Sequence, residues 1–225
     1  NDSQFGFRQG RSCVDSLFIL NTALEANKKQ NKESYLLFVD LSAAYDLVSR
    51  KKLISILEAM NFPRTLINFL SNYYEGDNIV TLSGGSWTKK QYQERGLRQG
   101  CNLSSILFII FMVGLSHRLD KQSVGIKLGK KLLSHLFFAD DICLCATSKE
   151  DLELLKRQLE LWCQETGMRV SSDKTQIITP NSTEVWTVTN MSDNESFFVE
   201  AVNCYKYLGI KQYKSLLQTP DERAT

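Results

Sequence analysis

Two adjacent acids interrupt an otherwise apolar stretch. Residues 137–145 read FFADDICLC, with Asp140 and Asp141 between two apolar runs. This pattern is typical of a β-hairpin, and we expect strands over 132–138 and 142–147 with both acids at the tip. Two-residue turns favour Asn-Gly, Asp-Gly or Gly-Gly because the backbone needs positive φ. Asp-Asp meets this requirement poorly, and its adjacent negative charges repel each other. Aspartate is also an ordinary turn residue, so the pair alone leaves a solvated turn and a chemical role both open.

A third acid gives the pair a chemical context. Asp40 ends the apolar run YLLFVD at 35–40, which is typical of a buried strand. If this strand and the hairpin are neighbours in one sheet, three carboxylates converge on one edge. Buried like charges shift their pKa values or require a cation, and carboxylate oxygens suit Mg²⁺. Two such ions can activate an attacking hydroxyl and stabilise the leaving oxygen of a phosphoryl transfer. We therefore interpret the three acids as metal ligands.

The composition is that of an ordinary soluble globular protein. Of 225 residues, 43% are hydrophobic and 23% charged, and the net charge of +2 neither requires nor excludes a nucleic-acid partner. Six cysteines without a CxxC pair and two histidines argue against a zinc site, and reduced thiols indicate an intracellular protein. The apolar run 103–115 is too short to span a bilayer, so we expect a buried helix and no membrane contact.

Periodicity and capping residues predict the elements that position these acids. We expect helices over 13–29, 50–60, 63–75, 103–120 and 149–166, a hairpin over 78–94 that turns at Gly84-Gly85, and strands near 124–128, 175–179, 185–189, 197–202 and 205–210. In the first helix we expect one apolar stripe, formed by Val14, Leu17, Phe18 and Leu24. The segment 181–196, rich in Asn, Ser and Thr, is the expected flexible loop. Helices that alternate with antiparallel hairpins predict an α+β fold with helices on one face of the sheet.

Six motifs in a fixed order resemble one enzyme family. They are FGFRQGRSCVDSLFIL, FVDLSAAYD, GLRQGCNLSSILF, FFADDICL, GMRVSSDKTQII and YKYLGI. Their order and spacing resemble those of reverse transcriptases, most of all the non-LTR (LINE-type) retrotransposon enzymes, with intron-encoded relatives close behind. The resemblance covers residues 4–210. It implies a polymerase palm, an antiparallel sheet backed by helices, with partial fingers and without a thumb.

The resemblance implies a metal site in the palm. Asp40, Asp140 and Asp141 would be the catalytic, metal-binding carboxylates, and Leu41 would offer a backbone carbonyl to the metal. The expected ion is Mg²⁺, with Mn²⁺ as the alternative.

Further residues acquire substrate roles from the same resemblance. Tyr45 would lie beneath the incoming sugar and exclude a ribose 2′-OH, Gln99 and Gly100 would lie near the template and the nascent pair, and Lys174 would approach the triphosphate or the acids. The expected nucleic-acid contacts are Arg8, Arg11 and Arg98, and YKYLGI would be a primer-grip-like hairpin. Structural roles stay open for these residues: Tyr45 as a core aromatic, Lys174 as a cap, and the arginines as surface charges.

The implied activity is that of an RNA-directed DNA polymerase. Its expected partners are an RNA template, a DNA primer, dNTPs and the rest of a parent polyprotein, with upstream fingers, a thumb and a possible endonuclease. The palm would comprise 35–49 and 101–210, parts of the fingers 1–34 and 50–100, and a tail 211–225 would lead to the missing thumb. The resemblance also implies a nuclear location.

Two other functions remain open. One is a catalytically inactive, retroelement-derived fragment that binds nucleic acid. The other is a different palm-type nucleotidyltransferase such as a cyclase, against which RQG and Tyr45 argue. The chain departs from the family at Asn102 and Ser105, where members often carry proline, so the turn into helix 103–120 is less constrained.

Overall fold

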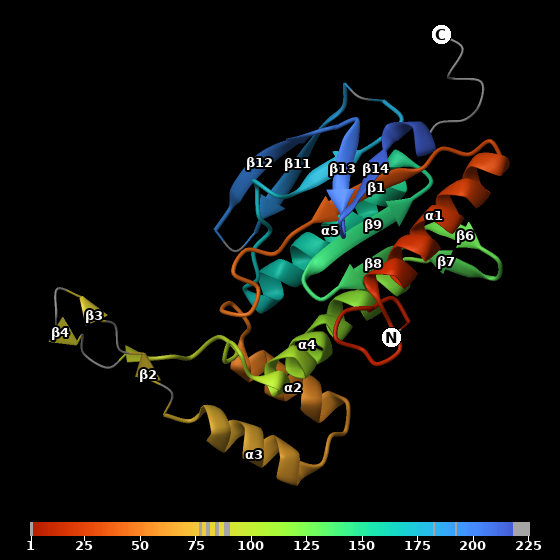
Figure 1. The fold of residues 1–225 in the computed structure, drawn as a ribbon. Coiled ribbons are helices and arrows are strands. Elements are labelled where there is room, and N and C mark those ends of the chain that lie inside the picture. Colours follow the sequence, from red (N-terminus) through yellow and green to blue (C-terminus); the bar gives the residue numbers. More distant parts are fainter. Residues whose placement is uncertain are drawn as a thin grey trace.

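The centre of the fold is a four-stranded antiparallel sheet (Figure 1). The computed structural model describes residues 2–76, 78–79, 82–83, 86–87, 91–181, 183–191 and 193–217. The strand order of the sheet is β10-β1-β9-β8, formed by β1 (Tyr35–Val39), β8 (His135–Phe138), β9 (Asp141–Ala146) and β10 (Gln176–Ile178). All five residues of β1 are buried, as the continuous apolar run predicts. The predicted pairing of the Asp40 strand with the hairpin is thus present in the sheet, because β1 pairs with β9.

Helices cover both faces of this sheet. The helices α4 (Asn102–Asp120) and α5 (Lys149–Thr166) share a core with Leu37 and Leu144. The helix α1 (Cys13–Lys29) shares a second core with the alternate residues Leu36 and Cys143. The α+β fold is confirmed, but the expectation of helices on one face only is wrong. The reason is that successive residues of β1 and β9 are all apolar, and successive side chains of a strand point to opposite faces.

The core-facing stripe of α1 differs from the expected one. Leu17, Leu20 and Leu24 are buried, whereas Val14 and Phe18 are 67% and 70% exposed. The prediction was therefore right for Leu17 and Leu24 and wrong for Val14 and Phe18. Residues at i, i+3 and i+7 line one face of a helix, and the face chosen here turns Phe18 away from the sheet.

The remaining elements follow the predicted order. They are α2 (Arg50–Ala59), α3 (Arg64–Tyr74), β2 (Asn78–Ile79), β3 (Leu82–Ser83), β4 (Ser86–Trp87), β5 (Gln91–Tyr92), β6 (Ile126–Leu128), β7 (Lys131–Leu133), β11 (Val185–Asn190), β12 (Glu195–Glu200), β13 (Cys204–Tyr207), β14 (Ile210–Tyr213) and the 3₁₀ helix η1 (Lys214–Leu216). All five predicted helices are confirmed within a residue or so of their predicted bounds. The predicted turn at Gly84-Gly85 lies outside the described residues.

Two predicted strands and one predicted loop need correction. The single strand expected over 132–138 is divided at Ser134, because β7 pairs with β6 while β8 pairs with β9. The strand expected over 205–210 instead contains the tight turn between β13 and β14. The loop expected over 181–196 is wrong, because this segment contains β11 and the start of β12, which pair along six positions, and the strands expected near 185–189 and 197–202 are confirmed.

Buried charges on α5 explain why this polar segment forms a strand. Lys156 and Glu160 are 8% and 4% exposed, and their charged atoms lie 3.8 Å apart. Lys156 donates to the carbonyl of Thr187, and the N–H of Thr189 donates to Glu160 at 2.9 Å. The helix thus provides hydrogen-bond partners for partly buried backbone groups of β11. Sequence periodicity places both residues on a polar face and gives no sign of this contact.

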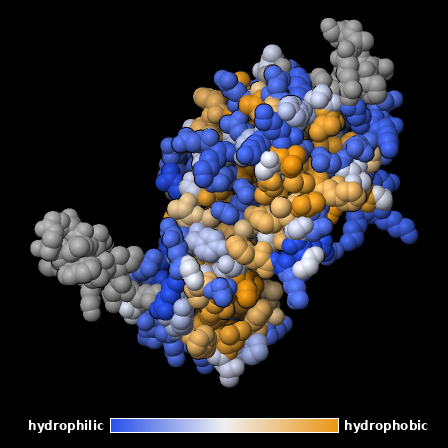
Figure 2. All heavy atoms as spheres, viewed as in Figure 1, coloured by the Kyte–Doolittle hydropathy of each residue, from blue (hydrophilic) through white to orange (hydrophobic). Residues whose placement is uncertain are grey.

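The helix α4 combines a core face with a surface face. It is long and apolar enough to cross a membrane by length and composition alone. In this fold Phe108, Phe111 and Leu115 are fully buried in the core that also includes α5. Figure 2 shows further apolar side chains gathered over the region of α3 and α4 on the visible face, and Phe69 and Ile106 on these helices are 54% and 53% exposed. Many apolar side chains of α4 are therefore buried in the core, and others, such as Ile106, lie on the surface.

His135 is a buried histidine that the fold keeps neutral. It is 1% exposed, and its two ring nitrogens are hydrogen-bonded with the hydroxyls of Ser116 and Ser134. Burial lowers the pKa of His135 to about 3. The Asp120 carboxylate lies 3.9 Å from the ring but is itself 53% exposed, so water screens its attraction for a protonated ring.

Acid should therefore destabilise the fold through His135. The folded-state pKa lies below the unfolded value of about 6.5, so the unfolded chain takes up the proton first as the pH falls. The stabilisation is present above pH 6.5 and is lost progressively towards pH 3. The difference in unfolding free energy between the wild type and His135→Gln should shrink by about 2 kcal/mol from pH 7 to pH 5. Urea denaturation at both pH values measures it, and a constant difference would contradict the prediction.

Candidate active site

The turn between β8 and β9 presents the paired acids. The last paired residues are Phe138 and Asp141, so the turn consists of Ala139 and Asp140. The expectation that both acids lie at the tip is wrong by one position, because Asp141 is the first residue of β9. Ala139, which is neither glycine nor an acid, adopts the positive φ of 57°. This conformation is unfavourable for a residue with a Cβ atom, so neighbouring contacts must hold it.

Strand register brings the third acid to the same edge. Val39 and Ile142 are the last paired residues of β1 and β9 at this end. Asp40 and Asp141 are the next residue outward on each strand, so the antiparallel register places them side by side. Lys174 is the adjacent cation, with Nζ 3.5 Å from Oδ1 and 3.4 Å from Oδ2 of Asp40. Strand pairing therefore accounts for the meeting of residues about a hundred positions apart in the chain.

Burial and neighbouring carboxylates raise the pKa values of Asp140 and Asp141. The pKa of Asp141 is raised to about 6, first by burial and then by the charges of Asp140 and Asp40. The pKa of Asp140 is also raised, first by burial and then by Asp40. Lys174 acts in the opposite direction on both groups but does not cancel these effects. The edge is therefore short of positive charge, and additional positive charge would stabilise its ionised form.

The donor set suits a hard divalent cation. Three carboxylates offer oxygen ligands of the kind that Mg²⁺ and Mn²⁺ prefer. Among the described residues no three His, Cys, Asp or Glu side chains are placed closely enough to ligate one ion together. The carboxylates thus share an edge without forming a closed cage, and Lys174 lies against Asp40. The chemistry fits a metal, and binding would require small side-chain movements.

The backbone carbonyl of Leu41 takes no part in the bridge that Leu41 forms. Leu41 is 2% exposed and forms an isolated antiparallel bridge with Val170. The hydrogen bonds of this bridge come from flanking residues, with Ser171 donating to Asp40 and Ser42 to Arg169. In such a pair the N–H and C=O groups of the two bridged residues point away from each other. The Leu41 carbonyl is therefore directed away from Val170.

A cavity of ≈ 390 Å³ brings together three of the four predicted substrate residues, Tyr45, Gln99 and Gly100, whereas Lys174 does not line it. The cavity lining is formed by Phe7, Tyr45, Arg98, Gln99, Gly100, Cys101, Asn102, Ser104 and Ser105. The Tyr45 ring is half-buried and stacks on Phe108 with ring centroids 4.8 Å apart and planes at 11°. Gln99 donates to the exposed carboxylate of Asp46 at 3.2 Å. Tyr45 is thus packed on the core on one side and faces the cavity on the other.

The three predicted arginine contacts lie in different surroundings. Arg98 lines the cavity, donates to the carbonyl of Tyr73 at 2.9 Å and lies 4.0 Å above that ring. Arg8 donates to the carbonyl of Gln4 at 3.2 Å. Arg11 lies 3.8 Å from Asp2 and 5.2 Å from the Phe5 ring. The cavity therefore includes Arg98, whereas these contacts of Arg8 and Arg11 are with their own N-terminal segment.

Sequence reasoning missed two aromatic residues at the site. Phe7 lines the cavity with a positive φ of 53° and is 59% exposed. Tyr205 stacks on Phe38 at 4.7 Å and donates to the carbonyl of Lys174 at 3.4 Å. Burial, and then the charge of Asp141, raise the pKa of Tyr205. Tyr205 belongs to the YKYLGI motif and Phe7 to FGFRQGRSCVDSLFIL, so both could have been identified from the motifs.

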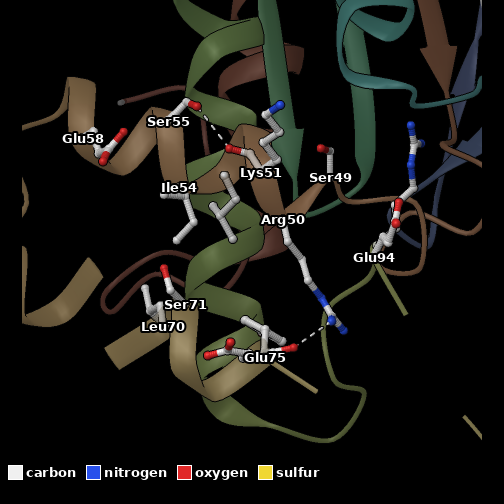
Figure 3. A pocket seen from close by; sticks show the side chains of 13 residues that line it. Ser49, Arg50, Lys51, Ile54, Ser55, Glu58, Leu70, Ser71, Glu75 and Glu94 are labelled. Carbon is white, nitrogen blue, oxygen red and sulfur yellow. Dashed lines mark hydrogen bonds between the residues drawn. The ribbon is translucent and has the colours of Figure 1, made fainter. Parts of the chain in front are cut away.

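A larger cavity, of ≈ 850 Å³, lies beside α2 and α3 (Figure 3). The Arg50 side chain extends into this region and donates to the carbonyls of Gln93 at 2.6 Å and Gly96 at 2.9 Å. Its guanidinium also lies 4.5 Å above the Tyr74 ring. These contacts join α2 to the segment that leads into the Gln99 loop. Arg50 therefore has a structural role, and none of the three acids lines this cavity.

Comparison with known proteins identifies the family. The reverse transcriptase (RNA-dependent DNA polymerase) family model matches residues 1–212. This chain belongs to the reverse transcriptase family. The Pol polyprotein of a type-2 retrotransposable element of Drosophila melanogaster is 29% identical over 172 residues, which are 76% of this chain and 16% of the polyprotein. The probable RNA-directed DNA polymerase from transposon BS of the same fly is 28% identical over 237 residues, covering 100% of this chain and 25% of the relative.

The fold of this reverse transcriptase chain is shared with telomerase. A structure of Candida tropicalis telomerase with a fragment of telomeric RNA matches with a TM-score of 0.69 and 14% identity, covering 100% of this chain and 34% of that one. At this identity the similarity concerns the fold alone. The relation to non-LTR retrotransposon polymerases is thus confirmed, and the chain spans 16% and 25% of the length of the two fly relatives.

Neutralising Asp141 should stabilise the metal-free fold. Its pKa of about 6 lies above the model-peptide value of 3.8, so ionised Asp141 destabilises the fold above pH 6. Because solvent screens a partly exposed group, Asp141→Asn should raise the unfolding free energy by about 1 kcal/mol at pH 7 in EDTA. The gain should shrink as the pH falls below 6 and should vanish only below the unfolded-state value of 3.8, where the carboxyl is protonated in both states.

Denaturation by urea, followed by tryptophan fluorescence, measures this gain. Asp173→Asn, which removes an exposed carboxylate, is the charge-matched control and should give no gain. A gain that persists at low pH, or one that the control reproduces, would contradict the prediction.

Proposed function

We propose that this chain is the palm, with part of the fingers, of an RNA-directed DNA polymerase that adds dNTPs to a primer 3′ end on an RNA template. The supporting observation is one edge of the sheet that holds Asp40, Asp140 and Asp141 next to Lys174. Membership of the reverse transcriptase family supports the same reaction.

The carboxylates and one carbonyl would hold the metal ions. Asp40, Asp140, Asp141 and the carbonyl of Leu41 are the proposed ligands of Mg²⁺ or Mn²⁺. Divalent ions held by these groups would supply Lewis-acid chemistry, by which a primer hydroxyl would be activated for attack on the α-phosphate and the leaving pyrophosphate oxygen would be stabilised. The strands contribute by holding the ligands at fixed positions before substrate arrives. The raised pKa values of Asp140 and Asp141 are those of groups that lack a cation.

Lys174 is suited to a role that changes with substrate. Its side chain is 67% exposed and interacts with Asp40 at 3.4 Å, a distance long for a charge-assisted hydrogen bond. An exposed pair of this kind is weak and can separate readily. We infer that Lys174 neutralises Asp40 in the free protein and moves to phosphate oxygens when a triphosphate binds.

Tyr45 is the proposed sugar-discriminating residue. Phe108 supports its ring from one side, so the ring cannot move away from a bound sugar without disturbing the core. A fixed planar ring leaves space for a 2′ hydrogen and clashes with a hydroxyl. Gln99, Gly100 and Arg98 line the same cavity and are the proposed contacts to the template and the nascent pair.

A nucleic-acid-binding fragment without turnover is the second candidate. The observation in its favour is that no three acidic or other ligand side chains of the described residues form a preassembled metal cluster. The two candidates differ in whether the chain incorporates nucleotides in the presence of Mg²⁺ or Mn²⁺.

Primer extension on an RNA template tests the proposed reaction. Asp140→Asn should lower the extension rate by about a hundred- to a thousandfold, because it removes a ligand needed for electrostatic stabilisation of the transition state. The assay should use the 225-residue chain and a chimera that carries flanking segments of a longer relative. Asp173→Asn is the control with the same change in charge. Extension by Asp140→Asn at the wild-type rate would refute the site, and a wild type that binds a hybrid without extension would favour the second candidate.

Nucleotide selection tests Tyr45 separately. Tyr45→Val should raise the ratio of rNTP to dNTP incorporation by about ten- to a hundredfold, because the steric barrier is removed. Tyr45→Phe keeps the ring and should leave the ratio unchanged. Losing the stack on Phe108 also destabilises the fold by about 1 kcal/mol, so the ratio is more informative than the rate. An unchanged ratio in Tyr45→Val would assign Tyr45 to the core alone.

A further inference from the structure

The N-terminal segment 3–6 lies against the strand that leads to the acidic turn. Phe5 donates its backbone N–H to the carbonyl of Phe137 at 2.8 Å, and Phe137 donates to the carbonyl of Ser3 at 2.8 Å. Gln4 and Phe137 form a parallel bridge. The segment therefore extends the sheet alongside β8, more than 130 residues away in sequence.

The Gln4 side chain forms hydrogen bonds with the backbone of Ala139 in the turn. Its Oε1 accepts from the N–H of Ala139 at 3.0 Å and from the N–H of Gly6 at 2.9 Å, and its Nε2 reaches the carbonyl of Ala139 at 3.5 Å. The side chain is 4% exposed. Two N–H donors face the same atom, so the amide orientation follows from its partners. Both backbone groups of Ala139 thus meet one carboxamide.

Ala139 is the residue of the turn that most needs such support. Its φ of 57° is a left-handed conformation, which costs an L-residue with a Cβ atom about 1–2 kcal/mol. The next residue is Asp140, so the conformation of Ala139 sets the direction in which this carboxylate leaves the turn.

Gly6 permits the close contact. A Cβ atom on Gly6 would lie 2.4 Å from the backbone nitrogen of Ala139, a distance that backbone atoms cannot accommodate. Any other residue would therefore push the segment away from the turn. A glycine and a glutamine two positions apart together fit the N-terminal segment to Ala139.

We propose that Gln4 is a positioning residue for Asp140: its carboxamide holds Ala139 in the left-handed conformation and thereby fixes the carboxylate for metal binding. The inference rests on the proposed function, because it takes Asp140 as a metal ligand. Without the carboxamide, the N–H of Ala139 would be buried and unpaired in this conformation. The turn would relax, and Asp140 would spend less time at the ligand position.

Another buried carboxamide provides a matched control. Asn27 is 2% exposed and donates to the carbonyl of Glu33 at 2.6 Å and to the hydroxyl of Ser34 at 2.9 Å. These contacts hold the chain just before β1, at the end opposite Asp40. Replacing Asn27 removes comparable hydrogen bonds from the same sheet and leaves the acidic turn untouched.

Direct titration with Mn²⁺ measures positioning without catalysis. Free Mn²⁺ is followed by electron paramagnetic resonance in the 225-residue chain, and each variant is also unfolded in urea. Gln4→Met, which keeps a long side chain and removes both polar atoms, should weaken Mn²⁺ binding about tenfold, as loss of a group that orients a ligand does. Asn27→Leu should lower stability and leave the Mn²⁺ affinity unchanged. Asp140→Asn reports whether the ion binds at the carboxylates.

Gly6→Ala tests the same contact from the other side. The added methyl group displaces the segment from Ala139, so its Mn²⁺ affinity should fall like that of Gln4→Met. This variant decides the question if Gln4→Met does not fold.

The outcomes separate the inference from the proposed function. Wild-type affinity in folded Gln4→Met or Gly6→Ala, with weaker binding in Asp140→Asn, would overturn the role of Gln4 and leave the metal site standing. An equal loss of affinity in Asn27→Leu would also overturn it, because general loss of stability would then explain the effect. Unchanged binding in Asp140→Asn would overturn the metal site itself, and the inference with it.

Discussion

Repulsion among three carboxylates at one edge of the sheet is the constraint on which this structure depends. Asp40, Asp140 and Asp141 are held close enough that burial and mutual charge raise the pKa of Asp141 to about 6. Metal-free protein would be more stable if these groups could move apart. They cannot, because β1 and β9 pair up to the residues beside them and the turn has only two residues.

Burial of the sheet on both faces supplies the rigidity that opposes this repulsion. The core with α4 and α5 contains Leu37 and Leu144, and the core with α1 contains Leu36 and Cys143. A strand packed on both sides cannot slip by one residue without changing the contacts of every side chain. The same packing supports Tyr45, whose ring is stacked on Phe108 of α4. The proposed metal ligands and the proposed sugar contact therefore depend on one core.

Sequence predicts those parts of this arrangement that depend on local patterns. A run of five apolar residues predicted β1, and caps and periodicity predicted the helices. Asp40 at a strand end and the paired acids at a hairpin tip predicted that the three would converge if the two strands were neighbours, and β1 does pair with β9. Motif resemblance, not geometry, pointed to Lys174, which indeed lies next to Asp40.

Features that depend on contacts between distant residues escaped prediction. Nothing in FFADDICL indicates that Ala139 takes the positive φ, because the Gln4 contact that supports it comes from 135 positions earlier. The polar composition of 181–196 predicts a flexible loop, although a strand is also predicted near 185–189. The strand β11 is present there, and no sequence pattern indicates that Lys156 and Glu160 of α5 contact its backbone.

The two side chains that support the backbone at the acidic edge, Gln4 and Asn190, are both uncharged. Asn190 holds Val170 much as Gln4 holds Ala139, accepting from its N–H at 2.8 Å and donating to its carbonyl at 3.1 Å, and Val170 is the bridge partner of Leu41. Both supports are neutral carboxamides. A fixed buried cation in either place would neutralise the carboxylates and compete with a metal, and a fixed anion would add to their repulsion.

Lys174, beside the acidic edge, is by contrast charged and exposed. Lys174 is long and 67% exposed, so its charge can leave Asp40 without leaving a buried group unpaired. The neutral carboxamides of Gln4 and Asn190 hold the backbone near the three acids without neutralising them, and the exposed charge of Lys174 can move away. The negative charge of the acids therefore stays available to an incoming metal ion. A lysine buried at the turn would relieve the repulsion equally well, and for that reason it would remove the electrostatic attraction on which metal binding depends.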